Sequence, residues 1–124
     1  MQKNILNWKA VKLMKALGVD KAAEEAFERE KKAGCVHAGY AVFTANWMFY
    51  DSSWTSGLFP LKEIAAYQKD YAPMSDIPRF YVRLLFRDGS KFKLPCEFGH
   101  LDKITTVLSE LCPQAKERPH GTYL

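Results

Sequence analysis

Two short segments of the chain hold a cysteine and a histidine close together, and these residue types bind zinc. Cys35 and His37 are separated by one residue, and Cys96 and His100 by three. Four such side chains match the ligand number of a structural zinc site. The spacings differ from those of zinc knuckles, and free cysteine is most often a buried apolar residue. Two buried thiols with two incidental histidines are therefore our main interpretation, and a metal or small-molecule site at these four residues is the alternative.

The motifs of common catalytic and cofactor sites are missing from the sequence. It has no Gly-x-Ser-x-Gly segment, and no cysteine or serine has a histidine and an acid at a recognised spacing. Glycine-rich phosphate-binding loops are missing as well. We therefore expect no enzymatic activity and no cofactor.

A further candidate site is a set of basic residues in the second half of the chain. Apolar residues alternate with mostly basic ones from Arg79 to Arg87, which is typical of a strand with one buried and one exposed face. Asp88-Gly89 then turns the chain into a second strand that ends at Cys96. The exposed positions of the two strands hold Arg79, Arg83, Lys91 and Lys93. An anion, a lipid headgroup or a nucleic acid binds such a surface, although a half-exposed sheet also needs a polar outer face.

The alternation in these two strands also predicts how they pair. A two-residue loop would place their apolar sets on opposite faces of the sheet, whereas a loop of three residues, 87–89, places them on the same face. Such a loop needs Gly89 in the left-handed conformation of a bulge. The expected pairs are Phe80 with Cys96, Val82 with Leu94 and Leu84 with Phe92.

Aromatic residues form a third group of candidates. Trp54 lies in the segment 51–57, which is rich in turn-forming residues. A tryptophan is hard to bury in such a loop, so Trp54 is a candidate for contact with a ligand or partner.

The first part of the chain predicts two helices. Apolar residues recur at helical spacing over residues 4–17, Gly18 ends this helix, and Asp20 is a suitable N-cap for a second helix over 21–33. The second helix has few apolar residues and should be solvated and weakly packed. The apolar stripe of the first helix fits docking on a sheet, and its cations fit contact with an anionic membrane. The membrane-contact candidates are Trp8, Lys9, Lys12 and Lys15.

From Gly34 onward the pattern changes from helical to strand-like. Aromatic and β-branched runs occupy 35–44, 46–51, 57–61 and 64–71, before the basic hairpin. Residues 33–50 contain no charged residue, but their glycines and turn formers favour a hairpin over a membrane span. A helix over 97–112 follows, with an apolar stripe that begins at Phe98, and the tail has no period.

These elements predict an α+β fold with a bent antiparallel sheet or partly open barrel of about six to seven strands, capped by a C-terminal helix. The expected organisation is a helical extension over 1–33, a sheet and helix over 34–112, and a tail over 113–124.

The order of these elements resembles that of pleckstrin-homology-like domains, especially small bacterial members without an assigned activity. The resemblance rests on AVFTANWMFY (41–50) as a first hairpin, LFPLKEIAAY (58–67) as a strand entered through a proline, and FYVRLLFRDGSKFKLP (80–95) before the closing helix. The resemblance implies a non-enzymatic binding or adaptor module. The basic cluster of lipid-binding members is missing, because the first hairpin loop is Thr44-Ala45-Asn46.

Composition narrows the class of protein and of partner. The 124 residues are 48% apolar and 26% charged, as in ordinary globular domains, and the net charge is +4. Three cysteines without a Cys-x-x-Cys motif favour a reducing cytoplasm over a disulfide framework. We expect a protein or peptide partner, with a membrane surface as a second option and nucleic acid as the weakest. An open-edged sheet is compatible with a homodimer.

Overall fold

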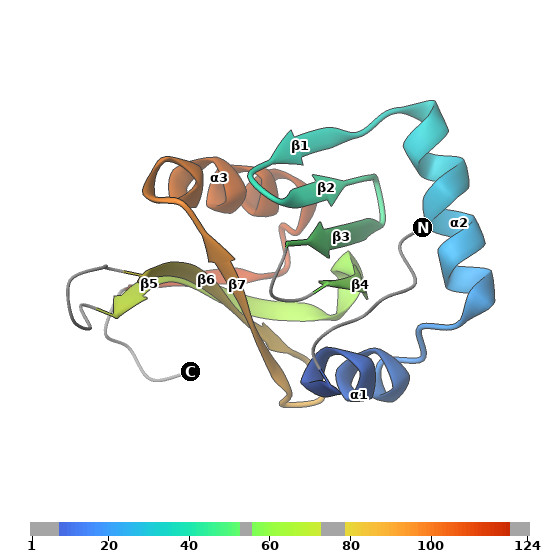
Figure 1. Cartoon of the computed structure of the whole chain (residues 1–124), viewed down its shortest axis with the longest axis horizontal. Helices are drawn as coiled ribbons and strands as arrows, with labels where there is room; N and C mark the ends of the chain where they lie inside the picture. Colours follow the sequence, from blue (N-terminus) through green and yellow to red (C-terminus); the bar gives the residue numbers. More distant parts are fainter. Residues whose placement is uncertain (1–7, 53–55, 73–78, 120–124) are drawn as a thin grey trace. The chain divides into compact units, whose positions relative to one another are not determined.

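The computed structural model describes residues 8–52, 56–72 and 79–119 (Figure 1). The chain divides into two compact units, Met1–Glu63 and Ile64–Leu124, and each is described by itself. Trp54 lies outside the described residues, and so does the beginning of the first expected helix.

The first unit consists of two helices and an antiparallel sheet. Its helices are α1 (Trp8–Ala16) and α2 (Lys21–Ala33), and its strands follow in the order β1 (Val36–Ala38), β2 (Ala41–Phe43), β3 (Trp47–Asp51) and β4 (Ser56–Pro60). The short 3-10 helix η1 (Leu61–Glu63) ends the unit. The uncharged segment 33–50 thus forms strands, as expected. Among the described residues, no helix is both long and apolar enough to cross a membrane.

Local signals set the ends of the two helices, as the sequence predicts. Gly18 has a φ of 75°, which favours glycine, and α1 ends before it. The Asp20 carboxylate accepts a hydrogen bond of 3.0 Å from the backbone N–H of Ala23 and caps α2. On α1, Leu13 is buried, and Met14 Sδ accepts a 3.1 Å hydrogen bond from the N–H of Leu58 on β4. Helix α1 therefore docks on the sheet of its own unit.

The second unit places one helix on a mixed sheet. The strands β5 (Ile64–Ala72), β6 (Arg79–Phe86) and β7 (Lys91–Cys96) are antiparallel, and β8 (Lys116–Arg118) pairs in parallel with β5. The order across the sheet is β7-β6-β5-β8. The helical part follows β7 and comprises η2 (Phe98–His100) and α3 (Leu101–Leu111).

This architecture confirms the α+β class and the C-terminal helix but corrects the predicted sheet. The described strands form two sheets of four strands, without a closed barrel, where we expected a single sheet of six to seven. The first sheet ends at Pro60, which lacks the N–H needed to continue a ladder, and η1 then redirects the chain. The predicted tail also contributes a strand, β8. Its three residues are too few to show an alternating pattern, so the sequence did not predict it.

The predicted register of the basic hairpin is confirmed. Phe80 pairs with Cys96, Val82 with Leu94 and Leu84 with Phe92, and Gly89 has a φ of 91°. The apolar side chains of both strands therefore share one face. Leu101, Ile104 and Leu108 of α3 are buried, but Phe98 is 70% exposed. We expected Phe98 to begin the buried stripe, and this was wrong because a 3-10 turn at 98–100 breaks the helical spacing.

The left-handed conformation of Gly89 leads to a testable prediction. Gly89→Ala should lower the free energy of unfolding by about 1–2 kcal/mol, because a Cβ atom is strained at positive φ even in open space. Gly99→Ala is the matched control, since a Cβ there meets no atom within 4 Å and its φ is not in the left-handed range. Chemical denaturation measures both variants, and equal losses would contradict a conformational role for Gly89.

Candidate functional site

The outer face of the β6–β7 hairpin brings together most of the basic residues predicted from the sequence. Arg83 lies directly opposite Lys93, and Lys91 lies opposite Leu85. Lys91 and Lys93 are exposed, and Arg83 is partly exposed. Arg79 begins β6, but its side chain is outside the described set. We call the surface formed by Tyr81, Arg83, Lys91 and Lys93 the basic face.

An acidic residue that we did not predict sits beside the basic face. Arg83 Nε donates a 2.5 Å hydrogen bond to Asp70 Oδ2 on β5, and the Asp70 side chain is only 14% exposed. Asp70 pairs with Tyr81 in the ladder and therefore shares its face. Gln68, Lys69 and Asp70 form an unbroken polar run in the predicted strand over 64–71, so no alternation in the sequence indicated on which face Asp70 lies. Asp70 holds the Arg83 guanidinium in place and neutralises its charge.

Tyr81 lies at the centre of the basic face. The Arg83 guanidinium is 5.6 Å from the centroid of its ring, and Lys93 Nζ is 5.0 Å away. Both distances fall in the range of cation–π attraction. Because Asp70 already pairs with Arg83, Arg83 offers a ligand less positive charge than its place in the sequence suggests.

An exposed aromatic cluster occupies the other face of β6, and sequence reasoning did not find it. The Phe80 ring lies 5.2 Å from Phe98 and 6.2 Å from Tyr71, centroid to centroid. Tyr71 and Phe98 are both exposed. The cluster joins β5, β6 and η2 at one end of the second sheet.

The cysteine and histidine residues are arranged differently from our main interpretation. Cys35 and Cys96 are only half-buried, whereas Cys112, the C-cap of α3, is fully buried, and none of the three forms a disulfide. Cys35 Sγ lies 3.7 Å from His37 Nε2. His100 Nδ1 is buried without a hydrogen-bond partner in the described part of the chain. No group of three or more potential metal ligands occurs among the described residues.

The three thiols differ in burial, so they should react at different rates. Burial raises the pKa of Cys96 and that of Cys112 to about 11, so both stay protonated near neutral pH. We expect iodoacetamide at pH ~8 to alkylate Cys35 first and Cys112 only after unfolding. Mass spectrometry of timed samples, with a denatured sample as reference, identifies the modified residue. Equal rates at Cys35 and Cys112 in the folded protein would contradict this assignment.

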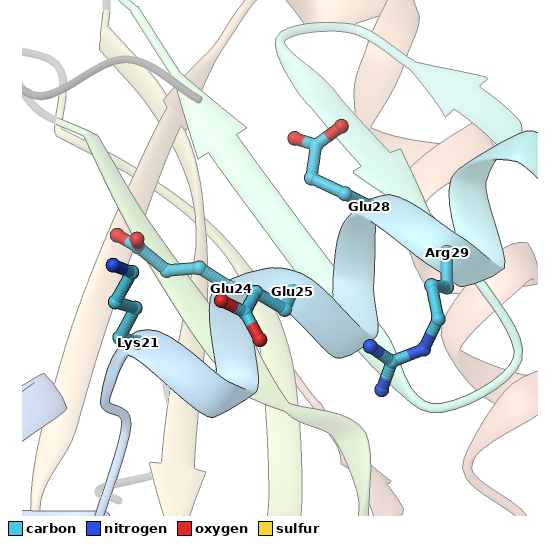
Figure 2. Close-up of a pocket in the computed structure, with 5 residues that line it drawn as sticks. All are labelled: Lys21, Glu24, Glu25, Glu28 and Arg29. Atoms are coloured by element: carbon cyan, nitrogen blue, oxygen red, sulfur yellow. The ribbon is translucent and has the colours of Figure 1, made fainter.

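A shallow hollow on α2 is lined by residues of one helix, as Figure 2 shows. Its side chains are Lys21, Glu24, Glu25, Glu28 and Arg29. Three acids and two bases of one helix line the hollow, and such a mixture of charges is typical of a solvated helix face. We assign it no function.

The membrane-contact candidates on α1 remain predictions. Lys12 and Lys15 are exposed, as such contact requires. Trp8 and Lys9 belong to α1, but their side chains are outside the described set. The apolar stripe that a membrane would need includes Leu13 and Met14, and these already contact the protein.

Comparisons of the chain with protein-family models, curated proteins and solved structures found no match. The function of the chain must therefore be inferred from its own residues.

Proposed function

We propose that this chain is a non-enzymatic binding module of pleckstrin-homology-like type, whose basic face docks an acidic segment of a partner protein. Strand hairpins followed by a C-terminal helix support the family, although fold alone does not set function. The observation that carries the proposal is the arrangement around Tyr81, where two cations flank an aromatic ring on an exposed sheet face. The three cysteines form no disulfide, which supports a reducing compartment such as the cytoplasm.

The spacing of Lys91 and Lys93 indicates which kind of peptide fits the basic face. Lys91 and Lys93 are two residues apart on β7 and share one face, so their Cα atoms are about 7 Å apart. Acidic residues at alternate positions of an extended peptide have the same spacing. Tyr81 offers apolar contact between the charges, and Arg83, held by Asp70, keeps its planar donor group oriented. An extended segment with alternate acidic residues fits this surface.

A bilayer fits the basic face less well. Each basic residue near an anionic membrane contributes about 1 kcal/mol, and recognised lipid-binding clusters hold about four to eight of them. The basic face holds only three basic residues, Arg83, Lys91 and Lys93, and Asp70 already pairs with Arg83. A membrane surface is therefore an alternative that the experiment must separate from a peptide.

Titration with a fluorescent peptide that carries glutamate at alternate positions tests the proposal. We expect salt-sensitive binding, and about tenfold weaker binding in the Lys91→Glu/Lys93→Glu variant, because like charges would then face each other. Lys62→Glu/Lys103→Glu is the matched control, since both lysines are exposed and the charge change is identical.

Three results would contradict the proposal. The first is no binding by the native chain, and the second is equal weakening in the control variant, which would show general charge attraction. The third is equal or tighter binding to phosphatidylserine vesicles or single-stranded DNA, which would point to a membrane or a nucleic acid.

A further inference from the structure

The edge strand β1 differs from the other sheet edges of the described chain. Strand β4 is completely buried, β7 carries two lysines and Pro95, and β8 consists of exposed charged residues. Charges and proline are the usual features that prevent edge pairing. Strand β1 has neither, and Val36 in it is 47% exposed. Figure 1 shows β1 at the margin of its sheet, where β2 is its one neighbour within the described residues.

Cys35 and His37 are in side-chain contact, at a separation that two ligands of one tetrahedral metal ion would also have. A Zn–S bond of ~2.3 Å and a Zn–N bond of ~2.0–2.1 Å at the tetrahedral angle place sulfur and nitrogen about 3.6 Å apart. The separation of Cys35 Sγ and His37 Nε2 is 3.7 Å. The described part of one chain offers no third ligand beside them, so these residues of one chain do not complete a four-ligand site.

The symmetry of an antiparallel strand pair indicates which residues a second copy of the chain would supply. Ala38 pairs with Ala41 across the two-residue turn 39–40. The backbone N–H and C=O groups of Ala38 therefore form hydrogen bonds with β2, and so do those of Val36, two residues earlier. The peptide groups of Cys35 and His37 alternate with these and point to the open edge. An antiparallel second β1 centred on Val36 would place Cys35 opposite His37 of the partner subunit. Alternate residues share a face, so all four side chains would lie on one side of this ribbon.

We propose that two copies of this chain pair through β1 and bind one Zn²⁺ ion with Cys35 and His37 of each copy. Each thiol loses its proton to solvent as its Zn–S bond forms, so two protons are released per ion. Two thiolates balance the charge of the ion. The same pairing covers Val36. Three-residue strands pair weakly by themselves, so the dimer depends on the metal. This inference does not depend on the proposed binding of an acidic segment.

Metal titration of the full chain under a phosphine reductant tests the proposal. We expect one Zn²⁺ per two chains, a dimer by analytical ultracentrifugation, and a monomer after EDTA is added. Co²⁺ should produce the visible absorption of tetrahedral coordination and a thiolate charge-transfer band. Cys35→Ser and His37→Ala should each abolish the dimer and the band. His37 is exposed and Cys35 is half-buried, and serine keeps the size of cysteine, so we expect both variants to fold. Cys96→Ser is the matched thiol control and should keep both.

A second variant tests the register rather than the ligands. Val36→Glu places two carboxylates opposite each other across the ribbon, so zinc-dependent dimerisation should weaken at least about tenfold. The proposal is overturned by the absence of zinc binding, by one ion per chain without a dimer, or by unchanged binding in both ligand variants. A dimer that separates with reductant but not with EDTA would be a disulfide and would also overturn it.

Discussion

Replacing Phe27 by alanine should lower the free energy of unfolding by about 3–5 kcal/mol, which is the usual loss for a buried phenylalanine. Phe27 is 1% exposed and is the one large apolar residue of α2, whose other apolar residues are alanines. Its ring lies 5.7 Å from that of Phe49 on β3. The cavity left by the substitution would remove the main apolar contact of α2. Chemical denaturation followed by circular dichroism measures the loss.

Phe98→Ala is the matched control for this prediction. It removes the same side chain from a position that is 70% exposed and contacts only the edge of the aromatic cluster at Phe80, so we expect a loss of about 1 kcal/mol or less. Phe27→Leu should fall between the two, because part of the volume is kept. If Phe27→Ala and Phe98→Ala had equal effects, the packing of α2 on its sheet would have to be reconsidered. The weak packing of α2 stays a prediction, and the structure shows only that its one large apolar residue, Phe27, is buried.

Replacing Glu30 by alanine should lower the free energy of unfolding by about 2 kcal/mol, because hydrogen bonds to a charged group are worth more than neutral ones. The Glu30 carboxylate accepts from Thr44 Oγ1 at 2.8 Å and from the N and Nδ2 atoms of Asn46 at 2.9 and 2.8 Å. Thr44 is buried, so its hydroxyl has little access to water once Glu30 is removed. The hydrogen bonds of Glu30 therefore hold the β2–β3 loop against α2. Thermal and chemical unfolding measure the effect.

The contribution of Glu30 should also depend on pH. Burial alone would raise the pKa of Glu30, but the hydrogen bonds from Asn46 and Thr44 outweigh it and lower the pKa below its ordinary value of 4.5. A lowered pKa means that the folded state binds the proton more weakly than the unfolded state. The stabilisation is therefore complete above pH 4.5 and disappears as the pH falls through the lowered pKa.

Glu30→Gln measures this dependence without a change of size. The difference in stability between the native chain and this variant should be constant near neutral pH and should vanish in acid. Glu25→Gln, an exposed position of the same helix, is the control and should show little difference at any pH. A Glu30→Gln difference that persists in acid would mean that the side chain acts through packing.

Features that depend on neighbouring residues could be predicted from the sequence. The Asp20 cap and the stop at Gly18 involve contacts within one helical turn. The register of the basic hairpin followed from alternation, since a slip of one residue would have moved every apolar side chain to the wrong face. The basic residues at Arg83, Lys91 and Lys93 were found for the same reason.

Features that join distant segments were decided only by the tertiary structure. Glu30 meets Asn46 across 16 residues, and Arg83 meets Asp70 across 13. Strand β8 joins β5 in parallel from the far end of the unit. Polar side chains and three-residue strands leave no periodic pattern in the sequence. A charged side chain also has many chemically equivalent candidate partners, and only the packing of the chain decides which one it contacts. The sequence by itself therefore determined the helix ends and the hairpin register, whereas the division into two sheets and the partners of Glu30 and Asp70 came from the fold. The physical reason is that hydrophobic periodicity specifies which face is buried but not which segment covers it.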